Sequence, residues 1–180
     1  MRRVLVGLLA LVLAGGQAAA QQLPPKTEPG RAPPRGAAAA PERGWDTDAV
    51  QFFVGIEEAD RANGFRTEMQ AAGCRGAQPL LCDLRLRGVA IRGRAPLPAR
   101  RMTEVEISLP GDVPRAIAAS VLHTMLRWAE PSAPRQARTD AVLMMVQTVT
   151  GRASTVVAGT SIRMDQGFSG FTVTLSPAPR

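Results

Sequence analysis

Apolar and charged side chains alternate in two stretches near the middle of the chain. In residues 82–87, Cys82, Leu84 and Leu86 are separated by charged residues. In residues 104–109, apolar and polar side chains again take turns. A period of two is typical of a strand with one face on a core and the other in water. Both stretches therefore predict strands of an antiparallel sheet, which commonly exposes one face to solvent.

Two amphipathic helices are predicted after the second strand. The first begins near Pro114, and its apolar positions recur every three or four residues: Ile117, Val121, Leu122, Met125 and Trp128. The second follows the break at residues 131–134 and runs to Thr150, where Gly151 ends it. Because the turn between them is short, we expect an antiparallel hairpin on one face of the sheet.

A further helix is predicted near residue 47, and it ends at Asn63 and Gly64. Gly55 inside it keeps a strand over residues 51–57 as the competing interpretation. Further strands are indicated at residues 155–158, 161–164 and 171–175. The expected fold is α+β: a single domain with an antiparallel sheet of four or five strands, a C-terminal helical hairpin packed on one face, and an N-terminal helix.

The chain before this domain has the composition of an export signal and a linker. A basic start and an apolar run at residues 4–14 precede small residues, which predicts a signal peptide at residues 1–20 with Ala18 as the alternative cleavage site. The run is shorter than the roughly 20 residues that span a bilayer, so no transmembrane segment is expected in the mature chain. Residues 21–44 contain six prolines and predict a disordered Pro/Ala/Gly-rich linker before the domain at residues 45–180.

The two cysteines, Cys74 and Cys82, predict a disulfide bond, because an exported chain with an even cysteine count meets an oxidising compartment. We expect the protein to be periplasmic or secreted. A redox-active pair would need closer spacing, and a metal site lacks ligands because His123 is the only histidine. Neither a metal nor another cofactor is therefore predicted.

Positive charge is concentrated in the same part of the chain. The formal net charge is +7, and residues 75–101 hold seven arginines against Asp83 alone. We predict an anion-binding surface formed by five of them: Arg85, Arg87, Arg94, Arg100 and Arg101. Arg85 and Arg87 are expected to share the outward face of one strand. The alternative interpretation is a solvated face whose arginines bind nothing.

These features favour a binding role over catalysis. Tyrosine is absent and aromatic residues make up only 4% of the chain, which argues against base stacking and nucleic-acid binding. We expect a small exported protein of the bacterial cell envelope that binds or scaffolds without being an enzyme. Its partner would be an anionic envelope component or another periplasmic protein.

The alternative hypothesis is a small periplasmic hydrolase or transferase whose site is assembled only in three dimensions. Ser169, Asp165 and His123 are the residues that it would use. The local pattern around Ser169 does not match a nucleophile elbow, because Phe171 stands where that motif needs glycine. His123 is expected to face solvent on its helix.

The linker interpretation leads to a direct test. Deleting residues 21–44 should leave the melting temperature of the domain almost unchanged, because the segment has almost no large apolar side chains to bury. Thermal unfolding of the mature and shortened proteins measures this. A loss of many degrees would mean that the segment packs on the domain.

Overall fold

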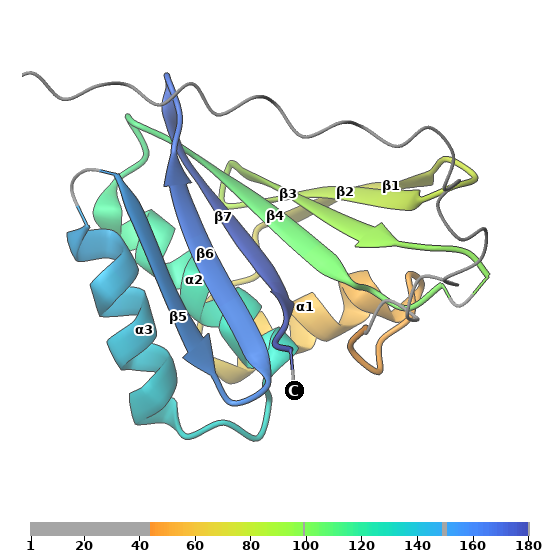
Figure 1. The fold of residues 1–180 in the computed structure, drawn as a ribbon, viewed down its shortest axis with the longest axis horizontal. Helices are drawn as coiled ribbons and strands as arrows, with labels where there is room; N and C mark the ends of the chain where they lie inside the picture. Colours follow the sequence, from red (N-terminus) through yellow and green to blue (C-terminus); the bar gives the residue numbers. More distant parts are fainter. Residues whose placement is uncertain (1–43, 99, 149–150, 180) are drawn as a thin grey trace, which may run out of the picture. The chain divides into compact units, whose positions relative to one another are not determined.

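The computed structural model describes residues 44–98, 100–148 and 151–179. They form a seven-stranded antiparallel sheet with the order β1-β2-β3-β4-β7-β6-β5 (Figure 1). The helices are α1 (Gln51–Ala62), α2 (Arg115–Ala129) and α3 (Arg135–Gln147). The strands are β1 (Met69–Arg75), β2 (Leu80–Leu86), β3 (Val89–Ala95), β4 (Glu104–Pro110), β5 (Arg152–Val157), β6 (Thr160–Gln166) and β7 (Gly170–Pro177).

The α+β class is confirmed, but the expected four or five strands and the C-terminal position of the helical hairpin are wrong. The sheet has seven strands, and α2 and α3 lie in the middle of the chain with three strands after them. β3 was not predicted, because two of its four inward positions are Gly93 and Ala95, which carry no large apolar side chain. The helix expected at the start of the domain forms as α1, and the competing strand over residues 51–57 does not form.

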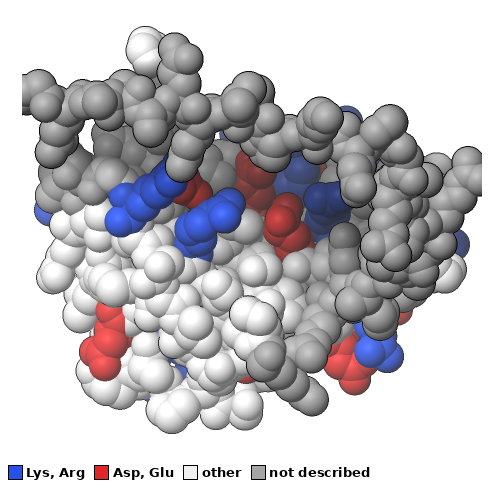
Figure 2. Space-filling model, viewed as in Figure 1, with Lys and Arg blue, Asp and Glu red and all other residues white. Residues whose placement is uncertain are grey.

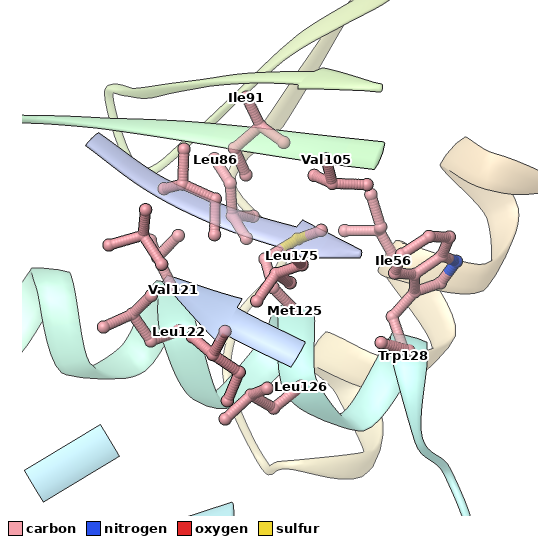
Figure 3. Packing of buried hydrophobic residues seen from close by; sticks show 14 of the residues in the cluster. Ile56, Leu86, Ile91, Val105, Val121, Leu122, Met125, Leu126, Trp128 and Leu175 are labelled. Atoms are coloured by element: carbon pink, nitrogen blue, oxygen red, sulfur yellow. The ribbon is translucent and has the colours of Figure 1, made fainter. Parts of the chain in front are cut away.

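The core lies between the sheet and the helices. Leu86, Ile91 and Val105 point from the strands toward α2, and Val121 and Met125 point back at them (Figure 3). Burying one such side chain contributes about 1.5–3 kcal/mol. α1 packs on α2, and α3 packs on α2 and β5. The alternation within β2, β3 and β4 therefore has its expected cause: one face is buried by helices, and the other is not.

Two glycines allow α1 to approach its neighbours closely. A Cβ atom at Gly93 would lie 2.9 Å from both the Met102 sulfur and the Phe52 ring. A Cβ atom at Gly55 would lie 2.9 Å from Cδ1 of Trp128. Gly55 made the helix prediction less certain. It lies inside α1, where its missing side chain makes room for Trp128 of α2.

A buried ion pair connects α1, α2 and the turn between β2 and β3. Arg87 donates a hydrogen bond to Asp60 Oδ1, and the Thr124 hydroxyl donates to the same oxygen at 2.7 Å. The guanidinium of Arg87 also lies 4.6 Å from the centre of the Phe65 ring. Asp60 and Thr124 are fully buried, so each charge of the pair depends on the other for compensation.

A chain of hydrogen bonds connects the start of the domain to β6 and to the end of α2. Trp45 Nε1 donates to the Thr160 hydroxyl at 3.0 Å, and that hydroxyl donates to Glu130 Oε1 at 2.7 Å. The Gly159 amide donates to the same carboxylate oxygen at 3.0 Å. Glu130 therefore holds the β5–β6 turn against the end of α2.

The predicted disulfide is confirmed: Cys74 and Cys82 are bonded and stand directly opposite each other on β1 and β2. No helix within the described ranges is both long enough and apolar enough to cross a membrane. The predicted signal peptide and residues 21–43 of the predicted linker lie outside the described residues.

Removing the charge of Asp60 should destabilise the domain strongly. Asp60→Asn leaves Arg87 buried without a counter-charge, and we expect a loss of about 3–5 kcal/mol in the free energy of unfolding. Denaturant titration provides the measurement. Glu57→Gln, which breaks the exposed pair with Arg61, is the matched control and should cost under about 1 kcal/mol. Equal losses in the two variants would contradict the assignment.

Candidate binding face of the sheet

The face of the sheet turned away from α1 and α2, here called the outer face, carries mostly polar and charged side chains. Blue and red side chains lie beside one another in the upper part of Figure 2, whereas the lower part of the view is mostly uncharged. From β1 to β4 the outward residues follow a cross-strand order: Gln70 with Arg85, Asp83 with Arg92, Ala90 with Ser108, Arg92 with Glu106 and Arg94 with Glu104. Polar side chains thus predominate on the face of the sheet that the helices do not cover.

The outer face is hollowed between β1 and β4. The cavity has a volume of about 550 Å³, within the ~300–1,000 Å³ typical of small-molecule sites. Small side chains, including Ala71, Ala90 and Ser108, form part of its lining, which leaves room above the strands. We call this cavity the outer hollow. Its charged lining residues are Arg75, Asp83, Arg85, Arg92 and Glu106.

Most charges in the outer hollow are paired. Asp83 accepts a hydrogen bond from Arg92 at 2.7 Å and forms an ion pair with Arg75 at 2.9 Å. The hydrogen bond and charge of Asp83, with a smaller contribution from Glu106, raise the pKa of Arg92 above its ordinary value. Both arginines are largely exposed and Asp83 is half-buried, so the pairing orders the side chains and adds little stability.

Arg85 differs from the other arginines of the outer hollow. Its cross-strand neighbours are Gln70 and Ala90, and no carboxylate among the described residues lies within ion-pair distance of it. Its Nη1 donates a hydrogen bond to the Gly88 carbonyl at 3.2 Å, which leaves its other donors for a ligand. Gln70 is its direct neighbour in the cross-strand row and Ser108 lies beyond Ala90 in the same row, and both offer uncharged donors. This row can hold an anionic group.

The five arginines predicted from the sequence do not converge. Arg85 lines the outer hollow, and Arg94 lies on the outer face opposite Glu104. Arg87 does not share the outward face with Arg85, because β2 ends at Leu86 and Arg87 turns inward to Asp60. The carboxylate that Arg87 binds is therefore Asp60 of the same domain, not a ligand.

Arg100 and Arg101 lie in the connection between β3 and β4, away from the outer hollow lining. The Arg100 carbonyl accepts a hydrogen bond from the Ala49 amide at 3.2 Å. Arg101 forms a β-bridge with Asp48 and approaches Asp46 at 3.4 Å. β3 extends to Ala95, so this connection begins at residue 96.

The sequence interpretation missed Arg75 and Arg92 as members of the site. Arg92 became visible as an outward residue only once β3 was known, and the signal was present in the alternation of Val89, Ile91, Gly93 and Ala95. Arg75 stands at the end of β1, a strand whose residues are almost all exposed and therefore show no buried period. The pairing of both residues with Asp83 required three-dimensional information.

Ser169, Asp165 and His123, the residues of the alternative hydrolase hypothesis, lie in different parts of the fold. Asp165 is on the outer face and forms ion pairs with Arg152 and Arg163 at 2.9 and 2.8 Å. His123 is on α2, which covers the opposite face, and Ser169 is in the β6–β7 connection. Within the described part of the chain, no group of three His, Cys, Asp or Glu side chains could hold a metal ion.

His123 is half-buried, not solvent-facing as the helical pattern suggested. The sequence of α2 alone could not show this, because α3 packs against α2 and that contact is not visible in the pattern of one helix. Burial lowers the pKa of His123, and the positive charges of Arg135 and Arg138 lower it further. The imidazole is therefore favoured in its neutral form.

The pKa direction of His123 predicts acid sensitivity. Because its folded-state pKa is below the unfolded value of about 6.5, the unfolded chain takes up the proton first as pH falls. The free energy of unfolding should decrease below about pH 6.5 and level off, for this group, below the folded-state pKa. His123→Gln should show a smaller decrease when denaturant titrations at pH 7.5 and 5 are compared. An identical pH dependence in both proteins would contradict this.

Comparisons with protein-family models, curated proteins and solved structures gave no match to this chain. The chemistry of the outer hollow is therefore inferred from its own residues. Arg85 can receive an anion, and Asp83 and Glu106 can accept hydrogen bonds from hydroxyl groups of the same ligand.

Proposed function

We propose that this protein is an exported, non-enzymatic binding protein of the bacterial envelope, which holds an anionic group of an envelope component in the outer hollow. The observation that carries the proposal is Arg85, a cation in a cavity of about 550 Å³ with no ion-pair partner among the described residues. The neighbouring Arg75 and Arg92 are both paired with Asp83, so Arg85 is the arginine of the outer hollow that can bind an anionic ligand.

The export part of the proposal rests on two independent features. The amino terminus has the charge and apolar pattern of a signal peptide. The domain also carries a disulfide between β1 and β2, and disulfides persist in oxidising compartments. A periplasmic or secreted location accounts for both.

The lining of the outer hollow favours a ligand that carries both a negative group and hydroxyl groups. Three arginines and two carboxylates line it, which leaves a net charge of +1 (3 − 2). A bare polyanion would meet Asp83 and Glu106 as like charges, whereas hydroxyl groups can donate hydrogen bonds to both. A phosphorylated sugar, as in lipopolysaccharide, has this combination of groups.

The hydrolase or transferase alternative has no comparable support. Its only histidine lies on the helix-covered side of the sheet, and Asp165 lies on the outer face in two ion pairs. The binding proposal does not require these three residues to lie together.

The mature protein should bind lipopolysaccharide at low ionic strength, and added salt should weaken the binding because it screens the charge of Arg85. Arg85→Gln should weaken binding about ten- to a hundredfold, which corresponds to one charge-assisted hydrogen bond. Isothermal titration measures both effects. Vesicles of phosphatidylglycerol test an anionic surface without sugars, and we expect weaker binding to them.

Arg163→Gln is the matched control, because Arg163 is an exposed outer-face arginine that does not line the outer hollow. It removes the same charge, while Asp165 keeps Arg152 as a partner. Equal losses in the Arg85 and Arg163 variants would indicate a diffuse charge effect and contradict the assigned site. Absence of binding to both lipopolysaccharide and anionic vesicles would contradict the anionic-ligand proposal.

A further inference from the structure

A second cavity lies at one end of the domain, where the β4–α2 connection meets α3 and β7. It has a volume of about 200 Å³, and we call it the end pocket. Its wall is apolar and includes the buried side chains of Leu109, Leu122, Met145 and Met164. Val113, Val146 and Phe171 also line it and are half-buried, so they form its more exposed part, here called the mouth. The lining of the end pocket is therefore mostly apolar, and its deeper part is formed by buried side chains.

Among the described residues, Arg115 is the one charged residue that lines the end pocket. Its side chain is exposed, and no carboxylate among the described residues is within ion-pair distance of it. α2 begins at Arg115 without a side-chain cap, so the positive end of the helix dipole lies beside this guanidinium. The wall thus favours a hydrocarbon, and the mouth favours a negative charge.

The volume limits what can enter. At about 200 Å³ the cavity is smaller than the ~300–1,000 Å³ of sites that take a drug-sized ligand, so a complete phospholipid does not fit. A single short hydrocarbon chain fits this space. Its charged end would reach Arg115 at the mouth.

We propose that the end pocket binds the anion of a medium-chain fatty acid, with the tail between α2, α3 and β7 and the carboxylate at Arg115. The end pocket shares no lining residue with the outer hollow, so this inference does not depend on the proposed function. An exposed aromatic residue, Phe168, lies in the β6–β7 connection, whose Ser169 carbonyl accepts a hydrogen bond from Gly111 of the pocket lining at 2.9 Å. Apolar surface is therefore exposed near the same end, where an apolar ligand would arrive.

A series of straight-chain carboxylates tests the proposal. Affinity should rise about three- to fourfold per added methylene until the pocket is full, because each buried methylene contributes a constant increment. Isothermal titration of butanoate, hexanoate and octanoate into the mature protein measures the rise. Octanol, which has the same tail without the charge, should bind about tenfold more weakly than octanoate. Equal binding of octanol and octanoate, or no dependence on chain length, would overturn the proposal.

Two variants locate the site. Arg115→Gln should weaken octanoate binding about tenfold, whereas Arg135→Gln should not change it. Arg135 is a matched control because it also follows a proline and begins a helix without a side-chain cap. Val146→Phe should fill the mouth and abolish octanoate binding, and its half-buried position leaves room for the larger ring without unfolding the domain.

The melting temperature of each variant is measured first, to show that it is folded. Octanoate should then raise the melting temperature of the wild-type protein and of Arg135→Gln but not of Val146→Phe. Unchanged octanoate binding in Val146→Phe would place the fatty acid elsewhere and overturn the proposal. The proposal would also be overturned if a peptide with a C-terminal leucine bound to the protein and octanoate did not.

Discussion

The buried ion pair between Asp60 and Arg87 determines which way the β2–β3 hairpin presents its two faces. β2 ends at Leu86, and Arg87 in the turn that follows points inward to Asp60, which leaves Arg85 as the last outward charge of β2. A shift of one residue would expose Leu84 and Leu86 and bury Arg85. Because an unpaired charge at Asp60 would be costly, the pair selects the observed register over the shifted one. The position of the candidate site thus depends on an interaction on the opposite side of the sheet.

The same division explains the distribution of charge over the domain. On the outer face most arginines have a carboxylate beside them, and these exposed pairs keep an open sheet surface hydrated at little energetic gain. On the helix-covered face, polar groups occur where elements must be joined, as in the chain from Trp45 through Thr160 to Glu130. Arg85 has no such partner among the described residues and lines the outer hollow. Arg115 also has none and lines the end pocket.

The parts of the fold that could be predicted are those whose buried face carries large side chains. β4 and β7 alternate clearly because Val105, Ile107 and Val173 are large and fully buried. β3 could not be recognised in the same way, because Gly93 must be small to admit Phe52 and Met102.

The position of Arg87 was missed for a related reason. It forms a two-residue turn with Gly88, in which both residues have positive φ angles of 50° and 81°. Such turns usually carry asparagine or aspartate first, so Arg-Gly gave no clear turn signal. The outer hollow itself, which needs pairing across four strands, had no local signature in the sequence.

The position of the disulfide has a consequence for when the chain becomes able to bind. β1 is an edge strand, and six of its seven residues are exposed, so few apolar contacts keep it on the sheet. The Cys74–Cys82 bond attaches it covalently to β2, and β1 supplies Gln70 and Arg75 to the outer hollow. Before the bond forms, this strand is expected to open more readily than the rest of the sheet. Oxidation would then complete the wall of the outer hollow, so that under the export proposed above a newly made chain would acquire this surface only outside the reducing interior of the cell.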